Sequence, residues 1–140
     1  MTLDELAGRL RTALQGRSEV RLAFLFGSTV TRGVDSAEDV DVAVSFAGSL
    51  SLLEQCALAS RLEEVVGREV DLVDLDQAST LLRWEVARSG VLLSARDPRE
   101  VTLFRARVPL EYFDLKPYLE REAEGLRRVL ERSRWSSSTS

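Results

Sequence analysis

The chain has 140 residues, a formal net charge of −4 and 44% hydrophobic residues, which is typical of one ordinary globular domain. This charge disfavours a protein that grips nucleic acid with its whole surface. Histidine is absent and Cys56 is the only cysteine, which excludes histidine-based nucleophiles, histidine zinc sites and an internal disulfide. We expect Cys56 to be a small core residue of an apolar helix. The chain shows no transmembrane run or signal peptide, so we expect a cytoplasmic protein.

Capping signals and apolar periodicity divide the first 95 residues into alternating helices and strands. Thr2 with Glu5 opens a first helix as a capping box, and Ser51 with Glu54 opens another, which Gly67 ends. The predicted elements in chain order are a helix to residue 16, a strand at 20–26, a turn or short helix to 33, a strand at 40–46, a helix at 51–67, a strand at 69–75, a helix at 79–88 and a strand at 91–93. This order predicts an α/β fold, a small mixed β-sheet with packed helices.

A long C-terminal helical segment follows, from about residue 97 to about residue 134. Asp97-Pro98-Arg99-Glu100 is typical of a helix start, with an aspartate N-cap and a proline in the first turn. Pro109 and Pro117 are expected to bend the helix. We therefore expect a single domain over 1–135 and a disordered tail over 136–140.

The end of the first predicted strand has the features of a phosphate site. Gly27 ends a buried apolar run, and a glycine there lets the backbone approach a ligand closely. Ser28 can begin a short helix whose free N–H groups suit a phosphate. A Gly-Ser pair alone is more often a simple turn, so its meaning depends on what lies beside it.

Acidic residues on the next two strands supply that context. Asp39 and Asp41 lie two apart on a predicted strand, so their side chains share a face. Paired like charges repel unless a cation lies between them, and Mg²⁺ is commonly shared between carboxylates and substrate phosphates. We expect Asp71 on the third strand to complete a two-metal site for phosphoryl transfer. Asp74 and Asp76 are competing candidates, although Asp74 faces away from Asp71 in a regular strand and Asp76 lies near the strand end.

The motif resembles the minimal nucleotidyltransferase (MNT) family of the DNA-polymerase-β-like superfamily. The resemblance rests on Gly27-Ser28, followed after ten residues by Asp39-x-Asp41 and later by the segment 70–74. It covers nearly the whole chain, including residues 81–90 and the helical C-terminus. Glu38 stands where many relatives have serine, and we expect it to face away from the paired aspartates.

The resemblance implies a polymerase-β-like nucleotidyltransferase core and a role for each motif residue. Gly27 and Ser28 would bind the triphosphate of ATP, the substrate. Asp39 and Asp41 would coordinate two Mg²⁺ ions. Asp71 would bind one of these ions and orient or deprotonate the acceptor hydroxyl.

The resemblance also implies a partner: the chain would be the antitoxin of a HEPN-domain ribonuclease toxin in a two-gene system. It would silence the toxin by transferring AMP from ATP to a toxin tyrosine, as well as by binding. The C-terminal segment supplies many apolar residues, of which we expect about half to pack on the sheet and the rest to be available to a partner. These residues are Phe104, Val108, Leu110, Tyr112, Phe113, Leu115, Tyr118, Leu119, Leu126, Val129 and Leu130.

Two other functions remain open from the sequence. The first is a non-catalytic antitoxin that neutralises its partner by occlusion. The second is an adenylyltransferase acting on a small molecule of the aminoglycoside type, against which the shortness of the chain weighs. A sequence-specific nucleic-acid reader is not expected, because no basic recognition helix or aromatic platform is evident.

Overall fold

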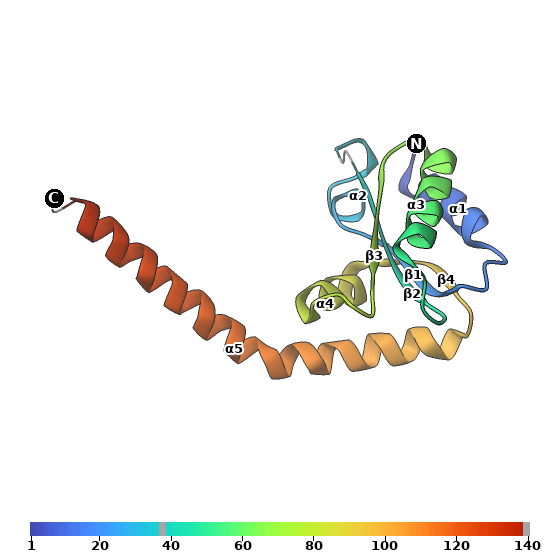
Figure 1. Ribbon diagram of the computed structural model, residues 1–140. Helices are drawn as coiled ribbons and strands as arrows, with labels where there is room; N and C mark the ends of the chain where they lie inside the picture. The colour runs from blue at the N-terminus through green and yellow to red at the C-terminus, as the bar shows by residue number, and fades with distance from the viewer. Residues whose placement is uncertain (37–38, 139–140) are drawn as a thin grey trace.

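Two strands, β1 (Val20–Phe26) and β2 (Val40–Phe46), pair antiparallel at the centre of a four-stranded sheet of order β3-β2-β1-β4. β4 (Val91–Ala95) pairs antiparallel with β1, whereas β3 (Val70–Asp74) runs parallel to β2. The sheet belongs to a computed structural model that describes residues 1–36 and 39–138 (Figure 1). The predicted mixed sheet is confirmed, while the predicted orientation of Glu38 falls outside the described residues.

The helices begin and end close to the predicted positions. In chain order they are α1 (Leu3–Leu14), α2 (Ser28–Thr31), the short 3-10 helix η1 (Val34–Ser36), α3 (Leu52–Val66), α4 (Thr80–Ser89) and α5 (Pro98–Ser138). Both predicted capping boxes are present, at Thr2 for α1 and at Ser51 for α3. Gly67 ends α3 in the left-handed conformation, with φ of 72°, which a glycine adopts without steric cost.

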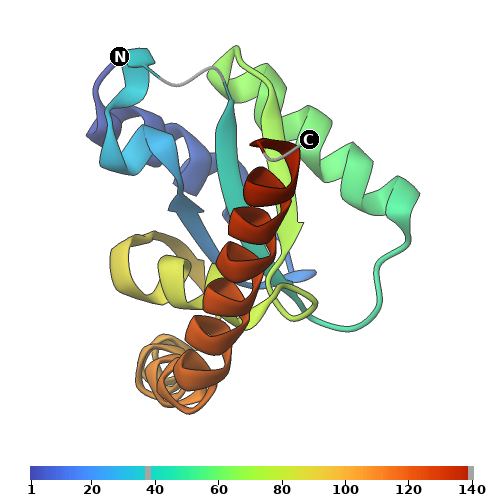
Figure 2. The same cartoon turned by 90° about the vertical axis from the view of Figure 1, so that its left-hand side faces the viewer.

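The helices cover the sheet on both faces (Figures 1 and 2). Leu25 and Val42 belong to the core that the sheet shares with α1 and α3. Phe24 and Ala43 belong to a second core, shared with α4 and the first part of α5. Because successive side chains of a strand point to opposite faces, Asp41 lies on the same face as Ala43, the face that α4 and α5 cover.

Helix α5 is longer than predicted. Pro109 and Pro117 both lie inside it, and it continues past the predicted end at about 134 to Ser138. Residues 139–140 of the predicted tail fall outside the described residues. Figure 1 shows α5 bending where its colour passes from orange to red. A proline inside a helix removes one backbone hydrogen bond and clashes with the preceding turn, which bends the helix without necessarily ending it. The predicted bend is therefore present within one continuous helix.

Cys56 does not lie in the core, contrary to the prediction. It is exposed on α3, whose buried residues are Leu58, Leu62 and Val66, one helical turn apart. The apolar start of α3 was misleading, because Leu52 and Leu53 are also exposed, at 77% and 80% of their surface.

Among the described residues, no helix combines the length and the apolar character that crossing a bilayer requires.

Candidate active site

Gly27 closes β1 directly against the carboxylate of Asp41. The register pairs Phe26 with Asp41, so the next residue turns over that side chain. Gly27 has φ of 81°, and a Cβ atom at this position would overlap Oδ2 of Asp41 and lie 3.2 Å from its Cγ. Only glycine therefore combines this backbone conformation with this close approach.

Ser28 begins α2, as predicted, with Gly27 as the residue that precedes the helix. The first amide to donate a hydrogen bond into this turn is that of Val30, which reaches the Gly27 carbonyl at 3.1 Å. The amides of Ser28 and Thr29 precede it, and in a helix such leading N–H groups have no intrahelical acceptor. The buried side chain of Thr29 connects this turn to β1, because its hydroxyl donates a hydrogen bond to the Phe26 carbonyl at 3.3 Å.

The predicted acids come together on one face of the sheet. Asp41 and Asp71 are direct partners in the register of the parallel pair β2 and β3. Val70 and Leu72 pack into the core under α1 and α3, so Asp71 points to the other face, toward the side of α4. Asp39 lies two residues before Asp41 but directly ahead of β2, not on the strand as predicted, and its charge still reaches Asp41. Asp41 is half-buried, whereas Asp39 and Asp71 are exposed.

The electrostatics of Asp41 are those of an acid without a counter-charge. Burial raises the pKa of Asp41 above its usual value, and the nearby charges of Asp71, Asp39 and Glu85 raise it further. Within residues 1–36 and 39–138, no arginine or lysine forms an ion pair with any of the three aspartates. Mutually repelling carboxylates of this kind fit a divalent cation.

The geometry limits how such a cation would be held. Among the described residues, no group of three or more acidic or thiol side chains is close enough to enclose a metal ion. Mg²⁺ usually takes one or two carboxylates and completes its octahedral shell with substrate phosphates and water. The donor set therefore fits magnesium that arrives with a nucleoside triphosphate better than a permanently enclosed ion.

Glu85 is a fourth acid of the site that sequence reasoning missed. It lies half-buried on α4, and its charge raises the pKa of Asp41 across the space between helix and sheet. Its neighbours Leu82 and Val86 pack into the core beneath α4. In the sequence, the segment 81–90 was noted only as part of the family resemblance. No spacing rule connects a glutamate on a helix to an aspartate on a strand forty-four residues earlier.

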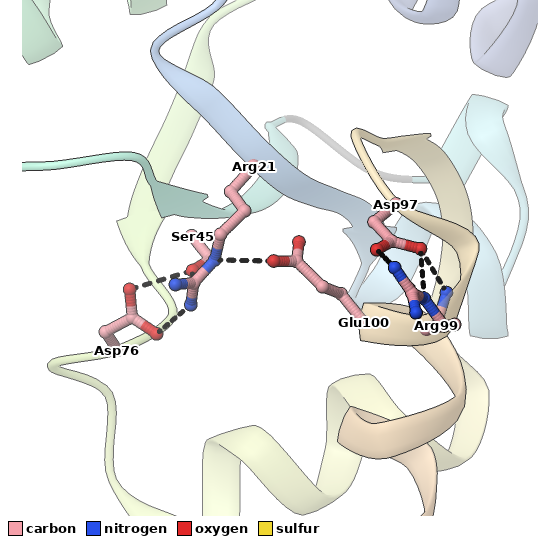
Figure 3. A network of polar contacts seen from close by, with 6 residues as sticks. All are labelled: Arg21, Ser45, Asp76, Asp97, Arg99 and Glu100. Atoms are coloured by element: carbon pink, nitrogen blue, oxygen red, sulfur yellow. Dashed lines mark hydrogen bonds and ion pairs between the residues drawn. The ribbon is translucent and has the colours of Figure 1, made fainter.

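The competing acids lie at the other end of the sheet. Ser45 is four residues along β2 from Asp41, which is about 13 Å in a strand, and its hydroxyl donates to Asp76 at 2.8 Å. Figure 3 shows Arg21 between Asp76 and Ser45 on one side and Glu100 on the other. Asp76 thus belongs to a structural network.

Asp74 is tied to the same end of the sheet, because its Oδ1 accepts a hydrogen bond from the Asp76 amide at 3.0 Å. A cavity of about 240 Å³ also lies there, lined partly by Arg21, Arg83 and Arg107. None of the predicted site residues lines this cavity.

Known proteins resemble this chain in sequence. Residues 9–99 match the family model described as polymerase beta, nucleotidyltransferase. The protein adenylyltransferase MntA of Shewanella oneidensis is 36% identical over 72 residues, which are 51% of this chain and 52% of that protein. The chain thus matches about half the length of this relative.

Solved structures are similar over a longer stretch. A chain in the crystal structure of a toxin–antitoxin with AMP-PNP has a TM-score of 0.73 and 26% identity, with 86% of this chain and 97% of that chain covered. A chain in the structure of a tri-AMPylated Shewanella oneidensis HEPN toxin in complex with an MNT antitoxin has a TM-score of 0.64 and 27% identity, with 88% and 93% covered. With a family match over most of its length and the glycine and acids of the motif on one face, the chain belongs to the polymerase beta nucleotidyltransferase family.

Proposed function

We propose that the chain transfers AMP from ATP to a tyrosine hydroxyl of a HEPN-domain toxin and thereby acts as its antitoxin. The observation that carries this proposal is the register of Asp41 and Asp71 on neighbouring strands, with Gly27 against Asp41. The relative named a protein adenylyltransferase and the solved structures with AMP-PNP and with an AMPylated toxin support ATP as the donor and a protein as the acceptor.

Each site residue has a distinct task in this proposal. The Gly27 backbone and Ser28 hold triphosphate oxygens, because the leading amides of α2 have no helical acceptors of their own. Asp39 and Asp41 would hold two magnesium ions, and Asp71, the register partner of Asp41, would hold one of them. Magnesium there would supply positive charge against the charge that develops on the phosphate oxygens during transfer.

The transfer itself is a displacement at the α-phosphorus of ATP. The tyrosine oxygen forms the new P–O bond, the bond to the bridging oxygen of the β-phosphate breaks, and pyrophosphate leaves. The hydroxyl proton goes to the carboxylate of Asp71, which is exposed to solvent.

The test is a transfer assay with Mg²⁺, labelled ATP and a HEPN-domain protein encoded by the adjacent gene. We expect AMP on the partner with the wild type and a loss of at least about 100-fold in Asp39→Asn/Asp41→Asn, because a metal site supplies several kcal/mol to the transition state. Asp74→Asn is the matched control, since Asp74 lies on the same strand as Asp71 but at the other end of the sheet. Adduct mass on each protein is the readout.

A non-catalytic antitoxin is the second candidate, and the exposed outer half of α5 is the observation that favours it. In that case none of the four nucleoside triphosphates yields an adduct, yet the wild type and the double variant bind the partner equally tightly. This outcome would overturn the transferase proposal.

A further inference from the structure

One face of α5 is apolar along almost its whole length, although the domain covers only its first part. Val101, Phe104, Val108 and Tyr112 recur at helical spacing, and the first three pack into the core beside α4. The same spacing continues with Leu115, Leu119, Leu126, Val129 and Leu130, which all lie within about 60° of one line along the helix at 100° per residue. We call these last five residues the arm face.

The outer part of the arm face is exposed, whereas Leu115 and Leu119 nearer the domain are half-buried. Leu126 and Val129 are each 61% exposed and Leu130 is 58% exposed, and none of the arm-face residues belongs to either core of the described chain. Figure 1 shows the outer half of α5 running away from the sheet, and Figure 2, turned by 90°, shows it in front of the sheet and coming toward the viewer. A contiguous exposed apolar stripe of this kind marks an interaction surface.

A second copy of the chain is a poor occupant of this stripe. Glu122 and Ser133 lie in the stripe between and beyond the leucines. Parallel self-pairing in register would place Glu122 against Glu122 in the middle of the interface. Antiparallel self-pairing, which sets Leu119 opposite Val129, would place Leu126 against Glu122. Both arrangements bury a carboxylate without a counter-charge, which is unfavourable.

The position of the arm favours a partner that is also the acceptor. The inner half of α5 packs on the sheet face that carries Asp41. At its outer limit, Tyr112 stacks on Trp84 of α4, with ring centroids 4.6 Å apart and an interplanar angle of 3°. Trp84 immediately precedes Glu85, the acid near Asp41. A protein lying along the arm face therefore lies beside α4, on the catalytic side of the domain.

We propose that the arm face docks the acceptor protein, by packing against an apolar helix that carries a lysine or arginine opposite Glu122. This proposal rests on the proposed function for the identity of the partner, and it assigns the binding of that partner to a surface separate from the catalytic acids. The arm face provides the binding surface for the acceptor protein, apart from the residues that bind the nucleotide. Helix-in-groove recognition of this kind uses apolar anchors one helical turn apart.

The test uses Leu119→Gln/Leu126→Gln, which removes apolar area from the arm face but keeps strong helix formers. The matched control is Glu124→Gln/Arg128→Gln, which alters the opposite face of the same turns and removes only an exposed ion pair. The full-length proteins are titrated with the HEPN-domain protein of the adjacent gene, and AMP-PNP binding is measured separately by calorimetry. Helicity by circular dichroism checks that each variant is folded.

We expect the arm-face variant to bind the partner at least about 10-fold more weakly and to modify it correspondingly less at low partner concentration, because buried leucine anchors carry much of an interface's energy. AMP-PNP binding stays at the wild-type level, and the control variant binds the partner like the wild type. Glu122→Lys should weaken binding as well, since it sets like charges against each other.

Two outcomes overturn the proposal. One is partner binding by the arm-face variant that equals that of the wild type. The other is a wild-type chain that sediments as a dimer and an arm-face variant that sediments as a monomer, which would assign the stripe to a second copy. If the arm-face variant fails to bind the partner but the wild type transfers no AMP, the docking surface stands and the proposed transfer fails. If the arm-face variant binds and modifies the partner like the wild type, the proposed transfer stands and the docking proposal fails.

Discussion

Replacement of Gly27 tests whether the position of the Asp41 carboxylate matters for AMP transfer, because it leaves every acidic residue in place. A methyl group at this position would overlap Oδ2 of Asp41, and the φ of 81° is strained for alanine. We predict that Gly27→Ala lowers AMP transfer by at least about 100-fold, because it displaces a carboxylate that the metal site needs. The measurement is the transfer assay together with the Kd for AMP-PNP in the presence of Mg²⁺.

Gly48→Ala is the matched control for this substitution. Gly48 also has a positive φ, of 88°, but no atom lies within 4 Å of the place that an alanine methyl group would take there. Both variants should lose roughly 1 kcal/mol of stability through backbone strain. Equal losses of activity in the two variants would show that Gly27 matters for the backbone alone and not for its contact with Asp41.

The raised pKa of Asp41 has a consequence for stability in metal-free protein. Because burial and like charges raise its folded pKa, the folded state favours the protonated acid. The stability from this preference is fully present below the unfolded pKa, about 3.8, and is lost as the pH rises through the folded pKa. At pH 7 the charge of Asp41 therefore destabilises the fold.

Asp41→Asn should consequently raise the Tm of the metal-free protein at pH 7, and this gain should vanish near pH 4. The gain is about 1 kcal/mol or less, roughly 3 °C, because solvent screens a half-exposed carboxylate. Thermal unfolding in a chelating buffer between pH 4 and pH 8 measures it. Mg²⁺ added together with AMP-PNP should stabilise the wild type more than the variant, and a lower Tm for the metal-free variant at pH 7 would refute the electrostatic explanation.

At the scale of elements, local signals were sufficient wherever the element is specified locally. The capping residues Thr2 and Ser51 and the terminator Gly67 set the helix ends as predicted, since each acts through backbone groups in its own turn. The dense apolar run of β1 predicted a strand covered on both faces, and its side chains are buried in the two cores.

Long-range arrangements were not available from such signals. Asp71 is the register partner of Asp41 because β3 pairs in parallel with β2, and the sequence alone does not specify that pairing. Glu85 acts on Asp41 from a helix to a strand, and no local sequence pattern predicts such a link. Cys56 was misplaced because the apolar composition of a helix does not determine which of its faces is buried.

At the scale of the whole molecule, the chain combines a nucleotidyltransferase domain with an arm, the outer half of α5, that extends beyond it (Figure 1). Phe104 and Val108 anchor α5 to the domain, with the Phe104 ring 5.3 Å from that of Phe24. From Pro117 to Ser133, every residue except the half-buried Leu119 is exposed. The outer half of α5 therefore adds little to the free energy of unfolding, and among the described residues its exposed apolar side chains belong to neither core.

Removal of residues 117–138 should accordingly leave the Tm within about 2 °C of the wild type, since exposed side chains contribute within about 0.5 kcal/mol each way. Phe104→Ala in the full chain provides the contrast and should cost about 3–5 kcal/mol, because it opens a cavity in the core. Thermal unfolding measures both, and AMP-PNP binding reports whether the shortened domain keeps its site. A shortened chain that unfolds many degrees lower would mean that the arm folds back on the domain. A stable, nucleotide-binding domain that has lost only its partner would instead mean that the fold keeps substrate recognition and chemistry on separate parts of one short chain.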